Sequence, residues 1–208
     1  AALNSAQLGA LSTDGIVALT STQVAVLNSV QVAGLSTTQI QAIESADLRA
    51  LGTAALRALS TAQLEALGSD QIGALGTGQV SALTTAQIAG LVSDDLNALT
   101  SAQIRALTTS QIAALGTAQT DVLTTDQVVA LSTDQVKALT TAQSTYLQPA
   151  QVTALSSDQL QALTSTNLNV WDALQIAAIS TSVLSSLNTT TIQSIGTNQV
   201  SMLIAAQV

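Results

Sequence analysis

The stretch LTTAQIAGLVSDDLNALTSAQIRALTTSQIAA, residues 83–114, decides the fold because it consists of four octapeptides with one pattern. The same pattern runs from Leu3 to Val208 without an insertion or a deletion. A short, fixed period is typical of a solenoid, in which each repeat contacts only its neighbours. We letter the places of the octad a to h, with Leu83 at place a.

The apolar residues of the octad are confined to three places. Place a is apolar in all 26 occurrences, place f is Ile, Val or Leu in 24 of 26, and place h is mostly Ala. The polar exceptions at place f are Thr120 and Ser144. Because place g accepts any residue type, we expect places a, f and h to face the core and place g to face solvent.

One continuous α-helix cannot satisfy this pattern. At about 100° per residue the apolar stripe would rotate by about 80° in each octad and would cover every face. Place b is Ser, Thr, Asn, Asp or Gly in 22 of 26 octads, and place e, three residues later, is Gln in 19 of 26. This spacing is typical of an N-cap with its capping-box partner, and it also puts Pro149 at the first helical position. The sequence therefore predicts an all-α solenoid of very short N-capped helices, one per octad.

The placement of charges also favours short helices. Ten of the twelve acidic residues stand at places b, d or e, and all four cations stand at place g. Acids near the start of a helix and bases near its end complement the helix dipole. The cations are Arg49, Arg57, Arg105 and Lys137.

The alternative fold is a β-solenoid with two octads in each coil, which would stack Leu, Thr, Gln and Ile in rows. Place c is Ser or Thr in 23 of 26 octads, which is stricter than a helical N1 position requires. The Ala-rich place h argues against strands, which disfavour Ala. Larger residues at place h, such as Val26, Val122, Tyr146 and Val170, recur in one phase of a 24-residue period. This recurrence predicts three octads per superhelical turn.

Composition excludes several classes of protein. The chain has 208 residues, a net charge of −8, no Cys and no His, and its four cations form no basic stripe for nucleic acid. Each octad interrupts its apolar residues with polar ones, so we expect no insertion into a membrane. Without His or Cys, the many Ser and Thr side chains lack an obvious activating base. We therefore expect no enzyme activity, no catalytic residue, no bound cofactor and no metal site.

Two groups of residues invite a functional interpretation. The carboxylates of Asp94 with Asp95, and of Asp126 with Asp134, would offer oxygen ligands to Ca²⁺, but the EF-hand spacing is absent, and we interpret them as complements of helix dipoles. Trp171 replaces Leu at place a. It is either an aromatic anchor for a partner or a local repacking of the core, and we favour the repacking.

The octapeptides LTTAQIAG, LTSAQIRA, LTTSQIAA and LSTDQVKA resemble the octapeptide arrays of very large bacterial surface or secreted proteins, which are often described as adhesin-like. The resemblance covers the whole chain and implies a structural, fibrous role outside the cell or at its surface. We therefore expect a spacer, a stalk or a self-assembling filament component. The alternative is a peptide- or glycan-binding solenoid module of an adhesin, which would gather aromatic or charged residues of place g on one side.

The chain reads as a single array of 26 octads, residues 1–208, with no separate domains. Neither end carries the polar cap that usually closes a solenoid. We therefore expect the chain to be a segment of a longer array or to associate with itself, head to tail or side by side. No sequence at the start of the chain resembles a targeting signal, so any such signal would lie outside these residues.

Overall fold

The computed structural model describes residues 3–208. It has 25 α-helices of four to six residues and one short 3₁₀-helix, and no strand occurs in residues 3–208. The prediction of an all-α solenoid is confirmed, and the alternative β-solenoid is wrong. The contacts divide the chain into two compact units. Unit 1 ends at Leu107, and unit 2 begins at Thr108. That all 26 octads form one continuous array stays a prediction.

Unit 1 contains the first thirteen helices. They are α1 (Ser5–Gly9), α2 (Thr13–Val17), α3 (Ser21–Ala25), α4 (Ser29–Ala33), α5 (Thr37–Gln41), α6 (Ser45–Leu48), α7 (Thr53–Arg57), α8 (Thr61–Glu65), α9 (Ser69–Ala74), α10 (Thr77–Ala82), α11 (Thr85–Ala89), α12 (Ser93–Asn97) and α13 (Ser101–Ala106). Each of them begins at place c of its octad, so the octad and the helix have the same period.

Unit 2 contains the other twelve α-helices and the 3₁₀-helix. They are α14 (Thr109–Ala114), α15 (Thr117–Asp121), α16 (Thr125–Ala130), α17 (Thr133–Lys137), α18 (Thr141–Thr145), α19 (Pro149–Ala154), α20 (Ser157–Ala162), α21 (Ser165–Leu168), α22 (Ala173–Ala178), α23 (Thr181–Ser186), α24 (Thr189–Ser194), α25 (Thr197–Val200) and η1 (Ala205–Gln207). The helices begin at place c here as well.

The residue at place b begins each helix as its N-cap, as predicted. Thr84 is typical: its backbone is extended (φ −73°, ψ 158°), and its hydroxyl accepts a hydrogen bond from the Gln87 amide. The Gln87 side chain accepts a bond from the Thr84 amide in return, which completes a capping box. Pro149 occupies the first position of α19, where a missing amide hydrogen costs nothing.

Each helix ends after about one and a half turns because the backbone becomes extended again at place a. Leu75, for example, follows α9 with φ −57° and ψ 144°. No residue in the range 3–208 has a positive φ. The corners between helices therefore need neither Gly nor Asn, which explains how so regular a fold forms with only 11 Gly residues.

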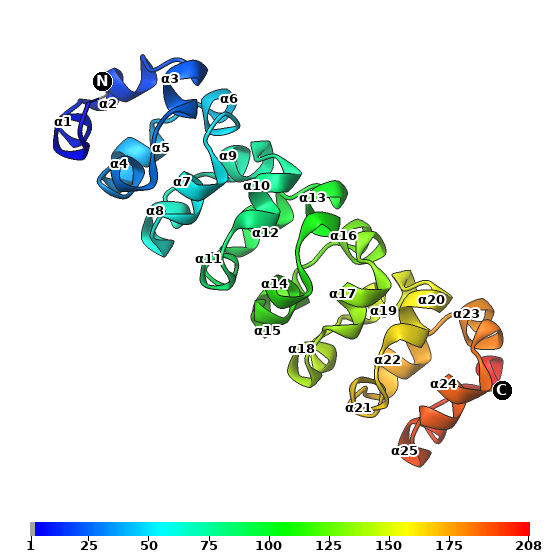
Figure 1. Cartoon of the computed structure of the whole chain (residues 1–208). Coiled ribbons are helices and arrows are strands. Elements are labelled where there is room, and N and C mark those ends of the chain that lie inside the picture. Colours follow the sequence, from blue (N-terminus) through cyan, green and yellow to red (C-terminus); the bar gives the residue numbers. More distant parts are fainter. Residues whose placement is uncertain (1–2) are drawn as a thin grey trace. The chain divides into compact units, whose positions relative to one another are not determined.

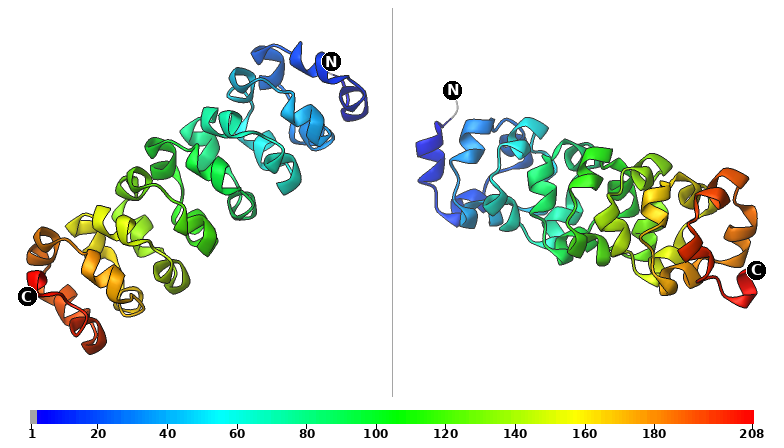
Figure 2. Two further views of the ribbon diagram at one scale, coloured as in Figure 1. Left: turned by 180° about the vertical axis from the view of Figure 1, so that it is seen from behind. Right: turned by 90° about the horizontal axis from the view of Figure 1, so that it is seen from below.

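Helices three octads apart lie side by side, so three octads make one coil of the superhelix in each unit. In unit 1 the sets are α1–α4–α7–α10–α13, α2–α5–α8–α11 and α3–α6–α9–α12. In unit 2 they are α16–α19–α22, α14–α17–α20–α23–η1 and α15–α18–α21–α24. Within each unit, Figures 1 and 2 show this succession of coils. The predicted 24-residue period is confirmed.

The core of both units is built from places a, f and e. Residues at place f, such as Ile88 and Val136, are fully buried, and most residues at place a are buried too. Place g is never buried in residues 3–208, as predicted. The prediction for place h is wrong, because these alanines lie at the end of each helix and are mostly only half-buried. Their place in the core is taken by the Gln residues of place e.

Candidate functional site

The most regular chemical feature of the chain is the buried Gln of place e. Gln87 in α11 is 2 % exposed. Its side-chain oxygen accepts the Thr84 backbone amide at 2.8 Å, and this bond closes the capping box. The carboxamide nitrogen remains free for a second partner, and a buried amide without one would cost about 1–3 kcal/mol.

The carboxamide nitrogen of Gln87 finds its partners in the preceding coil. It donates to the carbonyl oxygen of Leu59 at 2.8 Å and to that of Leu56 at 3.1 Å, 28 and 31 residues earlier. These carbonyls lie at the end of α7 and at the corner that follows it. One side chain thus provides hydrogen bonds to a backbone amide at the start of its own helix and to backbone carbonyls at the end of a helix in the neighbouring coil.

The same arrangement recurs through both units. The Gln side chain bonds the carbonyl 28 residues earlier at Gln31, Gln39, Gln63, Gln71, Gln79, Gln87, Gln103, Gln143, Gln151, Gln159, Gln175, Gln199 and Gln207. The repeated bond fixes the register of one coil on the next. The interface between coils is therefore the site that the octad pattern builds.

Sequence reasoning identified these Gln residues only as capping partners and missed the bond between coils. A signal was present, because place e never contains Glu. Glu would close a capping box equally well and would suit the helix dipole better. Its absence indicates that the amide nitrogen is needed.

Asp95 is the most informative exception at place e. It is 3 % exposed, and one of its carboxylate oxygens accepts the hydroxyl of Ser69 in the preceding coil at 2.9 Å. A carboxylate can accept that bond, but it cannot donate to backbone carbonyls as Gln does. Asp47 repeats this solution with Ser21, whose hydroxyl donates to it.

Burial raises the pKa of the Asp95 carboxyl above 3.8. The hydroxyl of Ser69 opposes this shift, and the neighbouring charge of Asp94 adds to it. The folded chain therefore binds this proton more tightly than the unfolded chain does. The contribution of Asp95 to the free energy of unfolding should therefore rise as the pH falls from neutral through the raised pKa towards 3.8.

We expect Asp95→Gln to stabilise unit 1 by about 1–2 kcal/mol at neutral pH. The new side chain can accept the backbone amide of Val92 and donate to the Leu67 carbonyl, 28 residues earlier, while the buried charge disappears. Urea unfolding followed by circular dichroism at pH 7 and pH 4 measures the gain, which should shrink at the lower pH. Asp94→Asn, at an exposed position, is the control. A loss of stability in Asp95→Gln would contradict the role assigned to place e.

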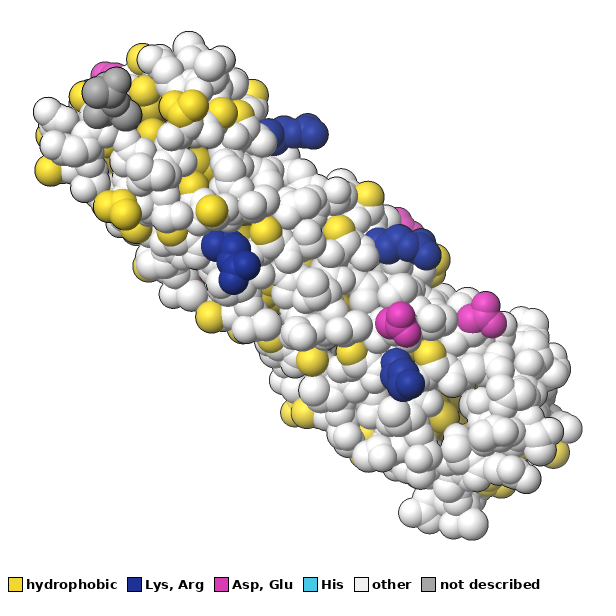
Figure 3. Space-filling view, in the orientation of Figure 1, with side chains coloured by type: hydrophobic (Ala, Val, Ile, Leu, Met, Phe, Trp, Pro, Cys, Tyr) yellow, Lys and Arg dark blue, Asp and Glu magenta, His cyan; other side chains and the backbone are white. Residues whose placement is uncertain are grey.

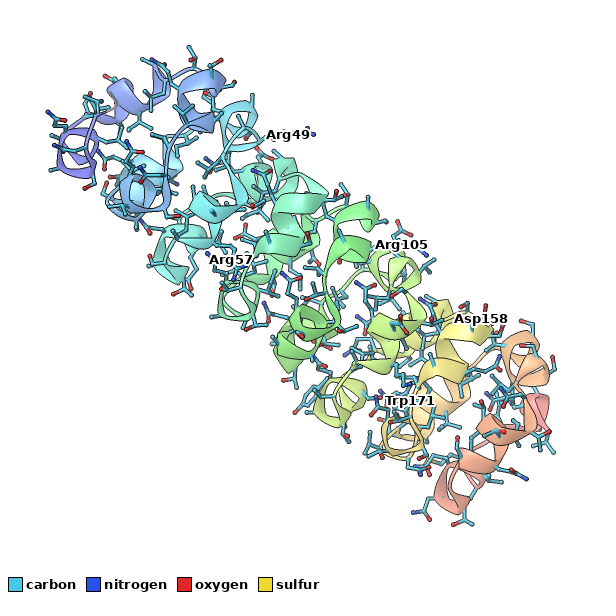
Figure 4. The ribbon with its side chains drawn as sticks, viewed as in Figure 1. Arg49, Arg57, Arg105, Asp158 and Trp171 are labelled. Carbon is cyan, nitrogen blue, oxygen red and sulfur yellow. The ribbon has the colours of Figure 1, made fainter. Side chains whose placement is uncertain are left out.

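Trp171 lies inside unit 2, so its interpretation as a repacking of the core is confirmed. The ring is 1 % exposed, and its indole nitrogen donates to the hydroxyl (2.9 Å) and to the carbonyl (3.1 Å) of Ser144. Ser144 is the small polar exception at place f, and its hydroxyl donates to the Asn167 carbonyl at 3.0 Å. A large residue at place a thus fills the space that a small residue at place f leaves in the preceding coil. Figure 4 labels Trp171 within unit 2.

The structure does not bring the other candidate residues together into a site. Asp126 and Asp134 lie exposed on the successive helices α16 and α17, which belong to different sets of stacked helices. Asp94 is exposed at the start of α12. In residues 3–208, no three acidic, His or Cys side chains are close enough to hold a metal ion.

The fold and the contacts between coils define the chain as a tandem-repeat protein built from helical octads. A family model, the ALTTAQ repeat, matches residues 1–29, 40–77, 91–125, 101–133 and 121–149. These matches cover more than half of the chain, so the protein belongs to the ALTTAQ repeat family. A search of curated proteins finds no match. Within residues 3–208, every helix is too short to span a lipid bilayer.

Proposed function

We propose that the protein is a structural array that acts as a spacer or as a component of a self-assembling filament at a bacterial surface or in its extracellular matrix. The observation that carries this proposal is the repetition of one bond between coils, from the Gln of place e to the carbonyl 28 residues earlier. An interface that repeats without change lets a chain grow by whole coils with no new chemistry. Such growth suits a protein whose task is to be long and regular.

The exposed residues support a spacer over an enzyme or a binding module. The side chains at place g are mixed, and none of them is aromatic. On the face drawn in Figure 3, the Lys and Arg side chains stand singly and do not gather into a basic patch. A groove for peptide or glycan usually gathers aromatic or charged groups. The arginines labelled in Figure 4 project from the surface of unit 1.

Deletion of whole coils tests the spacer role. Because the chain lacks Cys, dyes can be attached to Cys residues introduced at the exposed positions Ala25 and Asn97 of unit 1. We expect deletion of residues 59–82, which is one coil, to shorten the distance between the dyes. Deletion of residues 35–82, two coils, should shorten it by twice as much. Single-molecule energy transfer measures both changes.

The control for this series is the deletion of residues 59–78, which breaks the octad register. It should lower the helix content and unfold part of unit 1. A dye distance that is the same in all deletion variants would contradict the spacer role. Surface exposure is tested separately, by protease digestion of intact host cells that produce an epitope-tagged protein. If the tag is cleaved only after lysis, the proposed location is wrong.

A further inference from the structure

Unit 2 contains a region in which the octads depart from the pattern at exposed places. Before residue 205, place c is Ser or Thr in every octad except at Pro149 and Ala173. Tyr146 is the only aromatic residue at place h, and Leu174 is the only Leu at place d. The repeated contacts between coils need only the common residues of each place, so these exceptions require a separate explanation.

The fold brings these exceptions to neighbouring helices. Pro149 is the first residue of α19 and Leu174 is the second residue of α22, and α19 lies beside α22 (Figure 1). In unit 1, the Ser29 hydroxyl at place c donates to the carbonyl of Ala54 at place d, 25 residues later in the stacked helix. Pro149 and Leu174 have the same places and the same spacing, so they are neighbours. Tyr146 is the C-cap of α18 and stands three residues before Pro149, so the chain holds these two residues within about 11 Å of each other.

These residues and their neighbours form one apolar surface on unit 2, which we call the corner patch. The corner patch consists of the exposed or half-buried residues Tyr146, Pro149, Ala150, Val170, Ala173 and Leu174. Tyr146 is 54 % exposed, and Leu174 is 69 % exposed. Isolated exposed apolar residues are common on proteins, but a contiguous group with an aromatic ring is typical of a surface that a partner covers.

The repacking around Trp171 does not account for the corner patch. Trp171 and Ser144 are buried, and they compensate each other within the core. The side chains of Tyr146 and Leu174 are mostly exposed, so they fill no space in the core. Ala is the commonest residue at both of their places and would serve the fold equally well. We therefore interpret the size of these two side chains as an adaptation to another molecule.

The charged residues around the corner patch are all acidic. Helices α15, α16, α18, α19, α21 and α22, with their caps, contain three charged residues, which are Asp121, Asp126 and Asp172. Asp172 caps α22 and accepts the Leu174 amide at 2.9 Å. Asp121 accepts the side-chain amide of Gln148, which precedes Pro149. This acidic rim repels a second copy of the same patch, a nucleic acid and an anionic lipid surface, and it favours a partner with positive charge.

We propose that the corner patch docks a peptide segment of another protein, in which a large apolar side chain is flanked by Lys or Arg. The apolar side chain packs against Tyr146 and Leu174, and the Lys or Arg lies against the acidic rim. Apolar contacts with the aromatic ring supply most of the affinity, and the exposed charges guide the approach of the peptide. This inference goes beyond the spacer role, because it assigns the array one partner at one place along its length.

A phage-displayed library of random linear peptides tests this docking on the 208-residue chain. The library is first depleted on the double variant Tyr146→Ala with Leu174→Ala and is then selected on the wild type. Because both substitutions restore the commonest residue of their places, the double variant should fold, and circular dichroism checks this. We expect the selected peptides to combine Leu, Phe or Trp with Lys or Arg. By fluorescence anisotropy, the double variant should bind a selected peptide at least about tenfold more weakly than the wild type does.

Two further variants separate the apolar and the charged parts of the contact. Val26→Ala with Val30→Ala is the matched control, since these residues stand at places h and d in unit 1 and are each 71 % exposed. It should leave the affinity for the peptide unchanged. Asp172→Asn keeps the N-cap of α22, because Asn and Asp cap equally well. It should weaken binding about two- to fivefold at low salt, and added salt should remove the difference.

Several outcomes would overturn the docking. One is a selection that enriches no peptide, or only peptides without Lys and Arg. Another is equal binding by the wild type and the double variant, or an equal loss in the Val26 and Val30 control. Binding of neutral oligosaccharides that the double variant abolishes would assign the patch to a glycan instead. None of these results bears on the spacer role, which depends on the coil deletions.

Discussion

Gln87→Glu should destabilise unit 1 by about 3–5 kcal/mol at neutral pH, although the two side chains have nearly the same shape. The new carboxylate can still accept the Thr84 amide, so the capping box survives. Its second oxygen, however, faces the carbonyl oxygens of Leu56 and Leu59, to which the Gln nitrogen donates. A buried charge that meets acceptors in place of donors has no compensating partner. The substitution therefore removes the contact between coils and leaves the local cap in place.

Gln7→Glu is the matched control for this prediction. Gln7 closes the same capping box, but it is exposed, and its carboxamide nitrogen donates to no carbonyl in residues 3–208. Glu at this position should change the free energy of unfolding by no more than about 0.5 kcal/mol, and in the stabilising direction, because it lies at a helix N-terminus. Equal losses in both variants would show that the Gln of place e acts only as a cap.

Two measurements check the loss in Gln87→Glu. Urea unfolding followed by circular dichroism gives the change in stability, and hydrogen exchange at the Thr84 amide reports whether the capping box persists. Burial should raise the pKa of the introduced carboxyl. The loss should then shrink as the pH falls through that pKa, because the protonated acid can donate a hydrogen bond to a carbonyl.

The structure within each octad could be predicted from the sequence. Place b with its partner at place e indicates a cap and a capping box, and the placement of charge indicates where each helix starts and ends. Both signals span eight residues or fewer, so they can be recognised without knowing how the coils stack. The bond between coils joins residues 28 apart, and its register depends on the number of octads in a coil. A weak 24-residue recurrence was the only sequence signal for that number.

The prediction that place h faces the core is wrong for a physical reason. A small apolar residue that recurs in every octad resembles a core residue, whereas Gln resembles a surface residue. In the structure, the alanines of place h lie at the end of the helix, either as the C-cap, like Ala138, or as the last helical residue, like Ala74, and most of them are only half-buried. The Gln of place e is buried because both ends of its carboxamide are hydrogen-bonded. Polarity alone therefore predicts burial wrongly wherever a polar group has all of its partners.

The sequence marks Trp171 and Ser144 as separate exceptions, and only the three-octad coil shows that they belong together. They stand 27 residues apart, at place a of one coil and place f of the coil before it. Two departures from the pattern that compensate in volume leave the interface between the coils filled. This pairing allows a quantitative test.

Trp171→Leu should cost about 2–4 kcal/mol, because it opens a cavity beside Ser144 and removes the indole hydrogen bonds. Ser144→Val should cost about 1–3 kcal/mol, because the larger side chain meets a ring that already fills the space. The double variant restores the usual pair of the octad, with Val at place f and Leu at place a, at nearly unchanged total volume. It should therefore lie within about 1 kcal/mol of the wild type.

The four proteins form a double-mutant cycle that urea unfolding of unit 2 can measure. A coupling energy of about 2 kcal/mol or more in favour of the double variant would show that the two residues act as one packing unit. A second cycle combines Val136→Ala at place f with Leu163→Ala at place a. These two residues have the same spacing and the usual types for their places, so this cycle gives the reference coupling energy for two apolar residues. If the losses in the Ser144 and Trp171 variants simply add, each exception has its own structural cause. The compensation between coils would then be wrong, although the burial of Trp171 would stand.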